Sequence, residues 1–160
     1  MSTLAAIRAD SVNLPLFVHV FGAMLLTGTL FTVVVSTVMS RRGGADAFGL
    51  QRLGMKTVVI ALFPAYLLMR VGAQWTESEE NLPKEVEDST WLGIGYIAAD
   101  LGALLVIVTI VLSVIGLRRM RAAEGTAAGG QGQARAISII CIILLVAYVV
   151  AIWAMSTKPD

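Results

Sequence analysis

Residues 136–156 read AISIICIILLVAYVVAIWAMS, a run without a charged side chain that is long enough to cross a lipid bilayer as a helix. Three further apolar stretches precede it, at residues 14–39, 56–75 and 91–117. In hydrocarbon, a helix satisfies every backbone hydrogen bond within its own segment. The sequence therefore predicts an all-α, polytopic membrane protein with four transmembrane helices in an antiparallel bundle.

The composition leaves little room for anything outside this bundle. Of the 160 residues, 57% are hydrophobic and 14% are charged, whereas soluble domains carry about a quarter charged residues. We therefore expect residues 1–160 to form a single transmembrane domain with the lipid bilayer as its main partner. A net charge of +1 gives no reason to expect nucleic-acid binding. The one cysteine, Cys141, cannot form a disulfide within the chain.

Charged residues outside the spans are sharply segregated. Basic residues dominate the loop at 40–55 and the segment between the third and fourth spans, namely Arg41, Arg42, Arg52, Arg118, Arg119, Arg121 and Arg135. The loop at 76–90 is acidic, with Glu77, Glu79, Glu80, Glu85, Glu87 and Asp88 against Lys84. Positive loops stay in the cytoplasm, so we expect an acidic outer loop and both termini to be extracytoplasmic.

Other signals agree with this orientation. Trp75, Trp91 and Trp153 fall at the predicted outer ends, where an aromatic belt is expected. The glycine-rich stretch 122–134 is predicted to be a flexible cytoplasmic linker. Pro64 lies within the second span and should kink it. The predicted location is the bacterial plasma membrane, crossed several times.

Apart from serine and threonine, the few polar residues inside the spans all belong to the predicted outer half. His19, Arg70 and Asp100 are the ionisable ones. Tyr66, Tyr96, Gln74 and Tyr148 lie at similar depths. Side chains lean toward the N-terminus of their helix, so Arg70 and Asp100, on antiparallel helices, should approach each other and form an ion pair. This polar layer either locks the helices in register or lines a pocket open to the outside.

Three classes of function fit these residues. The first is a binding site in the outer half for haem, a metal or a small ligand, centred on His19, Arg70 and Asp100. His19 would be the metal ligand, with Met24 and Met69 as possible soft donors, although Met24 lies five residues from His19 and shares its face poorly. The second is a structural or accessory subunit of a larger membrane complex. The third is an oligomeric channel or proton-coupled transporter in which Asp100 and His19 titrate. No nucleophile–base constellation stands out, so an enzyme with catalytic residues is the least supported class.

The stretch Leu14-Pro-Leu-Phe-Val-His-Val-Phe-Gly-Ala-Met-Leu-Leu-Thr-Gly28 contains the pattern H-V-x-G-A-x-x-x-x-G. It resembles the first helix of small bacterial four-helix membrane proteins, which include CopD-type copper-resistance proteins, HemJ-type protoporphyrinogen oxidases and actinobacterial integral membrane proteins. The resemblance implies a four-helix unit in which His19 matches a histidine that the HemJ type associates with haem. This chain has no second histidine and no matching intramembrane lysine, so the resemblance does not carry an enzymatic activity over.

Overall fold

The computed structural model describes residues 10–44, 46–80, 90–123 and 127–157, and these are helical apart from short turns. The elements in chain order are α1 (Asp10–Ser40), α2 (Ala47–Thr57), the π-helix η1 (Val58–Leu62), α3 (Phe63–Glu80), α5 (Thr90–Ala122), the 3-10 helix η2 (Ala127–Gly130) and α6 (Gln131–Thr157). Helices α2, η1 and α3 form one continuous rod. Four helices are therefore long and apolar enough to cross a membrane, as the sequence predicts.

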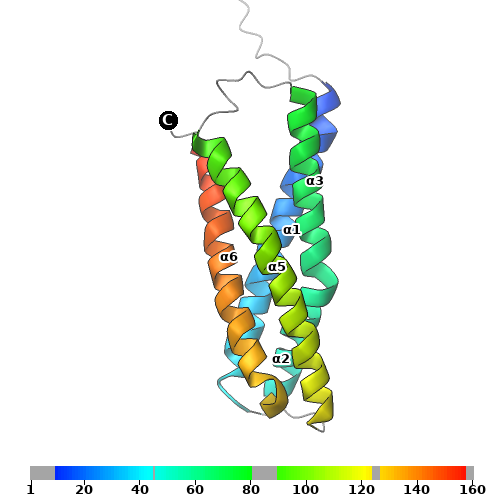
Figure 1. The fold of residues 1–160 in the computed structure, drawn as a ribbon, viewed down its shortest axis with the longest axis vertical. Coiled ribbons are helices and arrows are strands. Elements are labelled where there is room, and N and C mark those ends of the chain that lie inside the picture. The colour runs from blue at the N-terminus through cyan, green and yellow to red at the C-terminus, as the bar shows by residue number, and fades with distance from the viewer. Residues whose placement is uncertain (1–9, 45, 81–89, 124–126, 158–160) are drawn as a thin grey trace, which may run out of the picture.

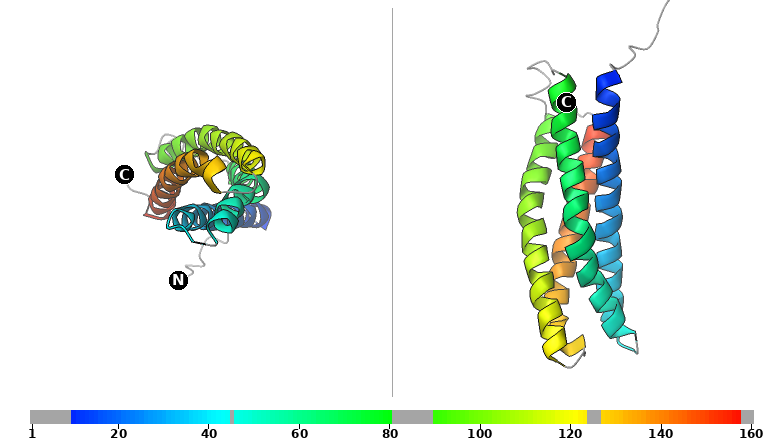
Figure 2. Two further views of the ribbon diagram at one scale, coloured as in Figure 1. Left: turned by 90° about the horizontal axis from the view of Figure 1, so that it is seen from below. Right: turned by 90° about the vertical axis from the view of Figure 1, so that its right-hand side faces the viewer.

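The four rods stand side by side in an elongated bundle (Figure 1). Helix α1 packs along the α2–α3 rod and also against α6, and α6 packs along α5. The lower part of α5 meets α2 and η1, whereas α3 and α5 barely touch. At the upper end of Figure 1, where α1 and α5 begin and α3 and α6 end, α5 stands apart from α3. The right-hand view of Figure 2 shows the same upright arrangement from the side, and the left-hand view shows it from below.

Apolar side chains fill the middle of the bundle and also cover its lateral surface. Leu26, Leu30, Val33, Ile137 and Leu144 form part of a continuous buried core. Large apolar residues are exposed on the outside of every rod, for example Phe17, Ile60, Leu104 and Val146. A soluble protein rarely exposes so large an apolar surface. The surface is what a helical bundle surrounded by lipid requires.

Helices α1 and α3 approach each other at two glycines. A Cβ atom on Gly22 would collide with the backbone nitrogen of Met69, and one on Gly72 would collide with the backbone nitrogen of His19. Small residues at a helix–helix interface allow backbones to come this close. This contact brings the His19 segment of α1 directly against the Met69 segment of α3.

The helices extend beyond the spans predicted from apolarity. The loop predicted at 40–55 contains most of α2, whose Gln51 and Met55 are buried. The acidic loop predicted at 76–90 is helical as far as Glu80, and residues 81–89 lie outside the described residues. Arginine, lysine and glutamate are good helix formers, so a helix continues through charged residues after it has left the apolar layer.

The predicted flexible linker at 122–134 is also largely helical where the structure describes it. Helix α5 runs to Ala122, η2 covers 127–130, and α6 begins at Gln131. Gly130 is buried, and a Cβ atom there would press on Gln51 and Met120. Gly130 therefore allows η2 to lie close to Gln51 of α2 and Met120 of α5, and residues 124–126 of the predicted linker lie outside the described residues.

Pro64 is the second residue of α3, and α3 follows the π-helix η1 directly. Proline has no N–H group and its ring clashes with the carbonyl four residues earlier. A wider turn before the proline relieves that clash, and π-helical turns within α-helices serve this purpose. The structural response to Pro64 is thus an extra residue in the preceding turn.

Candidate functional site

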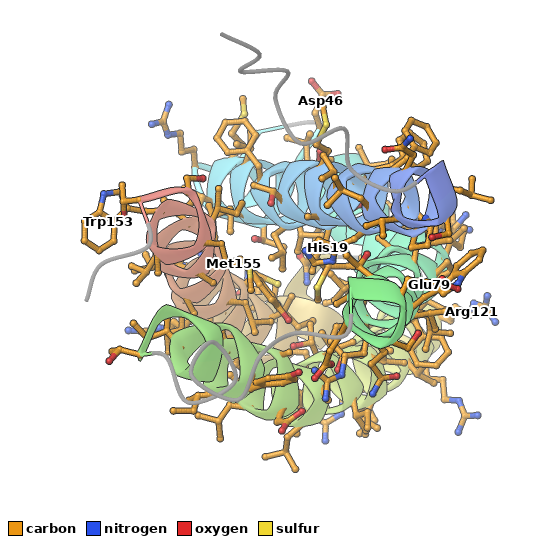
Figure 3. The ribbon with its side chains drawn as sticks, turned by 90° about the horizontal axis from the view of Figure 1, so that it is seen from above. His19, Asp46, Glu79, Arg121, Trp153 and Met155 are labelled. Carbon is orange, nitrogen blue, oxygen red and sulfur yellow. The ribbon has the colours of Figure 1, made fainter. Side chains whose placement is uncertain are left out.

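A small cavity lies between α1, α3, α5 and α6 in the upper half of the bundle. Its volume is about 40 Å³, enough for a few water-sized occupants. It is lined by His19, Ala23, Leu26, Thr27, Met69, Gly95, Ala98, Ala99, Tyr148, Ala151, Ile152 and Met155. Seen from the upper end of the bundle, His19 on α1 and Met155 on α6 both lie toward its centre (Figure 3). All four long rods therefore contribute to one cavity.

His19 is held by a hydrogen bond to the neighbouring helix. Its Nδ1 atom lies 2.9 Å from the backbone carbonyl oxygen of Met69. A carbonyl oxygen only accepts, so Nδ1 must carry the proton and donate. In the neutral imidazole, Nε2 then keeps its lone pair as an acceptor or metal ligand. Metal-ligating histidines are oriented by a hydrogen bond of this kind.

Two methionines join His19 at the cavity wall. Met69 on α3 is buried, and Met155 on α6 is half-buried. Met24, which the sequence also offered as a soft donor, is 69% exposed on the outside of α1 and does not line the cavity. The reason is helical periodicity, because Met24 lies five residues from His19 and so points away from its face.

Met155 is the site residue that the sequence analysis missed. It lies seven residues after Tyr148, so the two share one face of α6, and Ala151 and Ile152 between them also line the cavity. That periodicity was the available signal. Apolar residues recur all around this helix, however, and only the packed bundle shows which of them face inward.

Tyr148 contributes a buried hydroxyl group. Its side chain is 6% exposed, and its hydroxyl oxygen has no hydrogen-bond partner among the described residues. A buried hydroxyl without a partner costs about 1–3 kcal/mol. The Tyr148 hydroxyl also lies against Gly102, where any Cβ atom would collide with it. The cavity is therefore lined by a tyrosine whose buried hydroxyl has no partner among the described residues.

Arg70 and Asp100 form an ion pair between α3 and α5. Arg70 Nη2 donates to Asp100 Oδ1 at 2.7 Å. The Arg70 side chain is 22% exposed, whereas that of Asp100 is 68% exposed. Neither residue lines the cavity. The pairing expected from the sequence is present, but it lies on the lateral surface of the bundle, beside the His19 cavity.

The remaining polar residues surround this ion pair. The Tyr66 hydroxyl donates to the Ala99 backbone carbonyl at 3.1 Å, which adds a second link between α3 and α5. The Arg70 guanidinium carbon lies 5.7 Å from the centre of the Tyr96 ring, within range for a cation–π contact. Gln74 is exposed one turn beyond Arg70 and does not line the cavity. The single polar layer predicted from the sequence is therefore two separate sites. His19 and Tyr148 line the cavity, whereas Tyr66, Tyr96 and Gln74 lie beside Arg70 and Asp100.

The donor atoms of the cavity fit some ligands and not others. The described residues contain no cluster of three or more His, Cys, Asp or Glu side chains able to hold a metal. An imidazole nitrogen with two thioether sulfurs is instead a soft donor set, which suits a soft metal ion such as Cu(I). Haem does not fit, because pockets for molecules of that size measure hundreds of Å³ and this cavity measures about 40 Å³.

Comparison with protein-family models, curated proteins and solved structures finds no match to this chain. The class of the protein therefore follows from its own helices, which are those of a multi-pass membrane protein. Its function has to be argued from the cavity and from the ion pair.

Proposed function

We propose that this protein spans the bacterial plasma membrane four times and binds a single soft metal ion in the cavity beside His19. The observation that carries the proposal is the hydrogen bond from His19 Nδ1 to the Met69 carbonyl, which leaves Nε2 as a ligand in a cavity shared with two thioethers. The cavity admits an ion or a few waters, so a metal fits better than haem or a larger organic ligand.

The same proposal includes an orientation. The end of the bundle where α1 meets α2 and α5 meets α6 carries the basic residues, and there Arg41 also donates to the Arg135 carbonyl at 3.4 Å. Trp75 and Trp153 lie near the opposite end, where they are 40% and 57% exposed. Basic loops favour the cytoplasm and exposed tryptophans favour the interface. Both termini and the His19 half of the bundle then face the outside of the cell.

The test is metal binding by the full-length protein in detergent. We would titrate the protein with Cu(I) against a chromophoric chelator, use Ag(I) as a redox-inert substitute, and determine the metal content directly. One equivalent should bind to the unchanged protein. His19→Ala should weaken binding by about 100-fold or more, because outer-shell changes alone cost about 10- to 100-fold.

Matched methionine variants sharpen this test. Met69→Leu and Met155→Leu conserve volume but remove a sulfur from the cavity, so each should weaken binding by about ten-fold. Met24→Leu makes the same chemical change on the exposed side of α1 and should leave binding unchanged. Equal affinities for all four variants, or no stoichiometric binding to a folded protein, would refute the metal site. A Soret band in the unchanged protein that is absent from His19→Ala would show that the site binds haem and not a metal ion.

A structural role is the second candidate, and the Arg70–Asp100 pair favours it. This pair and the Tyr66–Ala99 hydrogen bond join α3 and α5, the two neighbouring helices that touch least. An accessory subunit would need such locks but no ligand in the cavity. We do not propose a proton relay between Asp100 and His19, because the first lies on the lateral surface and the second in the cavity.

A further inference from the structure

The lateral surface of α5 presents a carboxylate at the edge of an exposed apolar stripe, on the side that faces α3. Ile97, Leu101 and Leu104 are each more than 60% exposed. Ile97 and Leu104 lie three residues before and four residues after Asp100, so they share its face of the helix, and Leu101 lies on the adjoining side. Asp100 is itself 68% exposed. The face that would meet lipid tails in an isolated bundle therefore contains a charge.

The position of this charge along the helix puts it within the hydrocarbon layer. The apolar span on α5 runs over Gly93–Ala122 and that on the α2–α3 rod over Ala47–Glu79. At a rise of 1.5 Å per residue, Asp100 and Arg70 each lie about 11 Å from the middle of their span. The hydrocarbon half-thickness is about 15 Å. Charged groups at such depths face protein or water, because lipid contact is costly.

The Asp100 carboxylate also has hydrogen-bonding capacity left. An ionised carboxylate has two oxygens with about four lone-pair sites. Among the described residues, Arg70 is the donor that reaches it, through Nη2 and one oxygen. Gln74, one turn after Arg70, is exposed as well. The surface at the α3–α5 seam is therefore polar, exposed and incompletely paired.

We propose that this seam is the interface of a homodimer in the membrane, with a two-fold axis parallel to the membrane normal. Arg70 and Asp100 lie at the same depth, so the direction from one to the other runs within the membrane plane. A two-fold axis along the normal reverses that direction in the second copy. Each Asp100 then faces the partner's Arg70, and the two ion pairs lie head to tail.

Charge complementarity is the reason for choosing a second copy as the occupant. The pair has a positive and a negative end at one depth, so its surface is complementary to itself under this rotation, which is what a two-fold interface requires. The exposed leucines and isoleucine of the stripe would pack around the four charges. The proposal is independent of what fills the His19 cavity.

Oligomeric state in lipid is the first measurement. Full-length protein labelled at one site and diluted in liposomes should photobleach in two steps at high protein density and in one step at low density. The double variant Arg70→Gln/Asp100→Asn removes both charges and leaves neither unpaired. It should weaken dimerisation by about ten-fold or more while retaining the helix content of the unchanged protein.

Mixing two single variants tests whether Asp100 of one copy contacts Arg70 of the other. A copy with Arg70→Gln keeps Asp100, and a copy with Asp100→Asn keeps Arg70. Across the proposed interface these copies restore one charge pair, so the mixed dimer should be tighter than either homodimer. Equal affinity of all three combinations would overturn the proposed contact.

Cross-linking of otherwise unchanged protein avoids reliance on charge variants. With Cys141→Ala as the background, Leu104→Cys, on the same face of α5 as Asp100, should form an oxidised dimer in the membrane. Val149→Cys is the control, because it shares a face of α6 with Trp153, which points away from the bundle on the side opposite α3 (Figure 3). Cross-linking at Val149→Cys instead of Leu104→Cys would overturn the proposal. A protein that stays monomeric but is stabilised by phosphatidylethanolamine over phosphatidylglycerol would assign the face to a lipid amine.

Discussion

Arg70 on α3 donates a 2.7 Å hydrogen bond to Asp100 on α5, although the Asp100 side chain is 68% exposed and that of Arg70 is 22% exposed. The pair is thus a bridge on the lateral surface between two helices that otherwise barely touch. Its two members differ in what their loss leaves behind. Removal of Asp100 leaves a largely buried guanidinium, whereas removal of Arg70 leaves a carboxylate at the surface of the bundle.

This asymmetry predicts an order of stabilities. Asp100→Ala should lower the free energy of unfolding by about 1–3 kcal/mol, because it leaves the Arg70 charge without its partner. The polar contact itself contributes less, since such contacts between membrane helices average less than 1 kcal/mol. Arg70→Gln/Asp100→Asn should cost less than Asp100→Ala. Unfolding in mixed detergent micelles, followed by circular dichroism, would measure both. If the double variant is at least as unstable as Asp100→Ala, the main loss is the interaction between the two side chains and not the unpaired charge of Arg70.

A second prediction concerns the close contact between α1 and α3. Gly72→Ala should destabilise the protein by about 1–3 kcal/mol, because the added methyl group meets the His19 backbone and the helices must separate. The same separation lengthens the His19–Met69 hydrogen bond, so metal affinity should fall as well. Gly28→Ala is the matched control, since a Cβ atom there meets nothing within 4 Å.

The control variant has its own expected sign. Alanine is a better helix former than glycine by about 0.5–1 kcal/mol, so Gly28→Ala should be neutral or stabilising. Thermal unfolding and the metal titration, carried out on Gly72→Ala and Gly28→Ala, would test both expectations. If Gly72→Ala and Gly28→Ala behave alike, the backbone contact does not hold the site together.

The third prediction is the orientation in the membrane. In a Cys141→Ala background, Ser78→Cys lies exposed near the end of α3, and Arg42→Cys lies exposed just after α1. A membrane-impermeant maleimide added to intact cells should label the first variant and should label the second only after the cells are lysed. The reverse pattern would invert the orientation and place the His19 cavity toward the cytoplasm.

The number and identity of the membrane-crossing helices followed from the sequence alone. A run such as 136–156 has to be helical in lipid because no water is present to satisfy its backbone. The pairing of Arg70 with Asp100 was also accessible, since their depths and the lean of their side chains could be counted along two antiparallel helices. Helix ends were not, because charged residues such as Arg118 and Glu79 continue a helix as readily as apolar ones.

What the tertiary structure decided is which residues face inward and which face out. Helices that are apolar on all sides have no amphipathic stripe to reveal their rotation. The spacing from His19 already disfavoured Met24, and the packing placed Met69 and Met155 at the cavity. It also separated one predicted polar layer into a cavity beside His19 and an ion pair on the lateral surface. The physical reason is the backbone contact at Gly22 and Gly72, which sets the rotation of α1 against α3 and so turns His19 toward the centre.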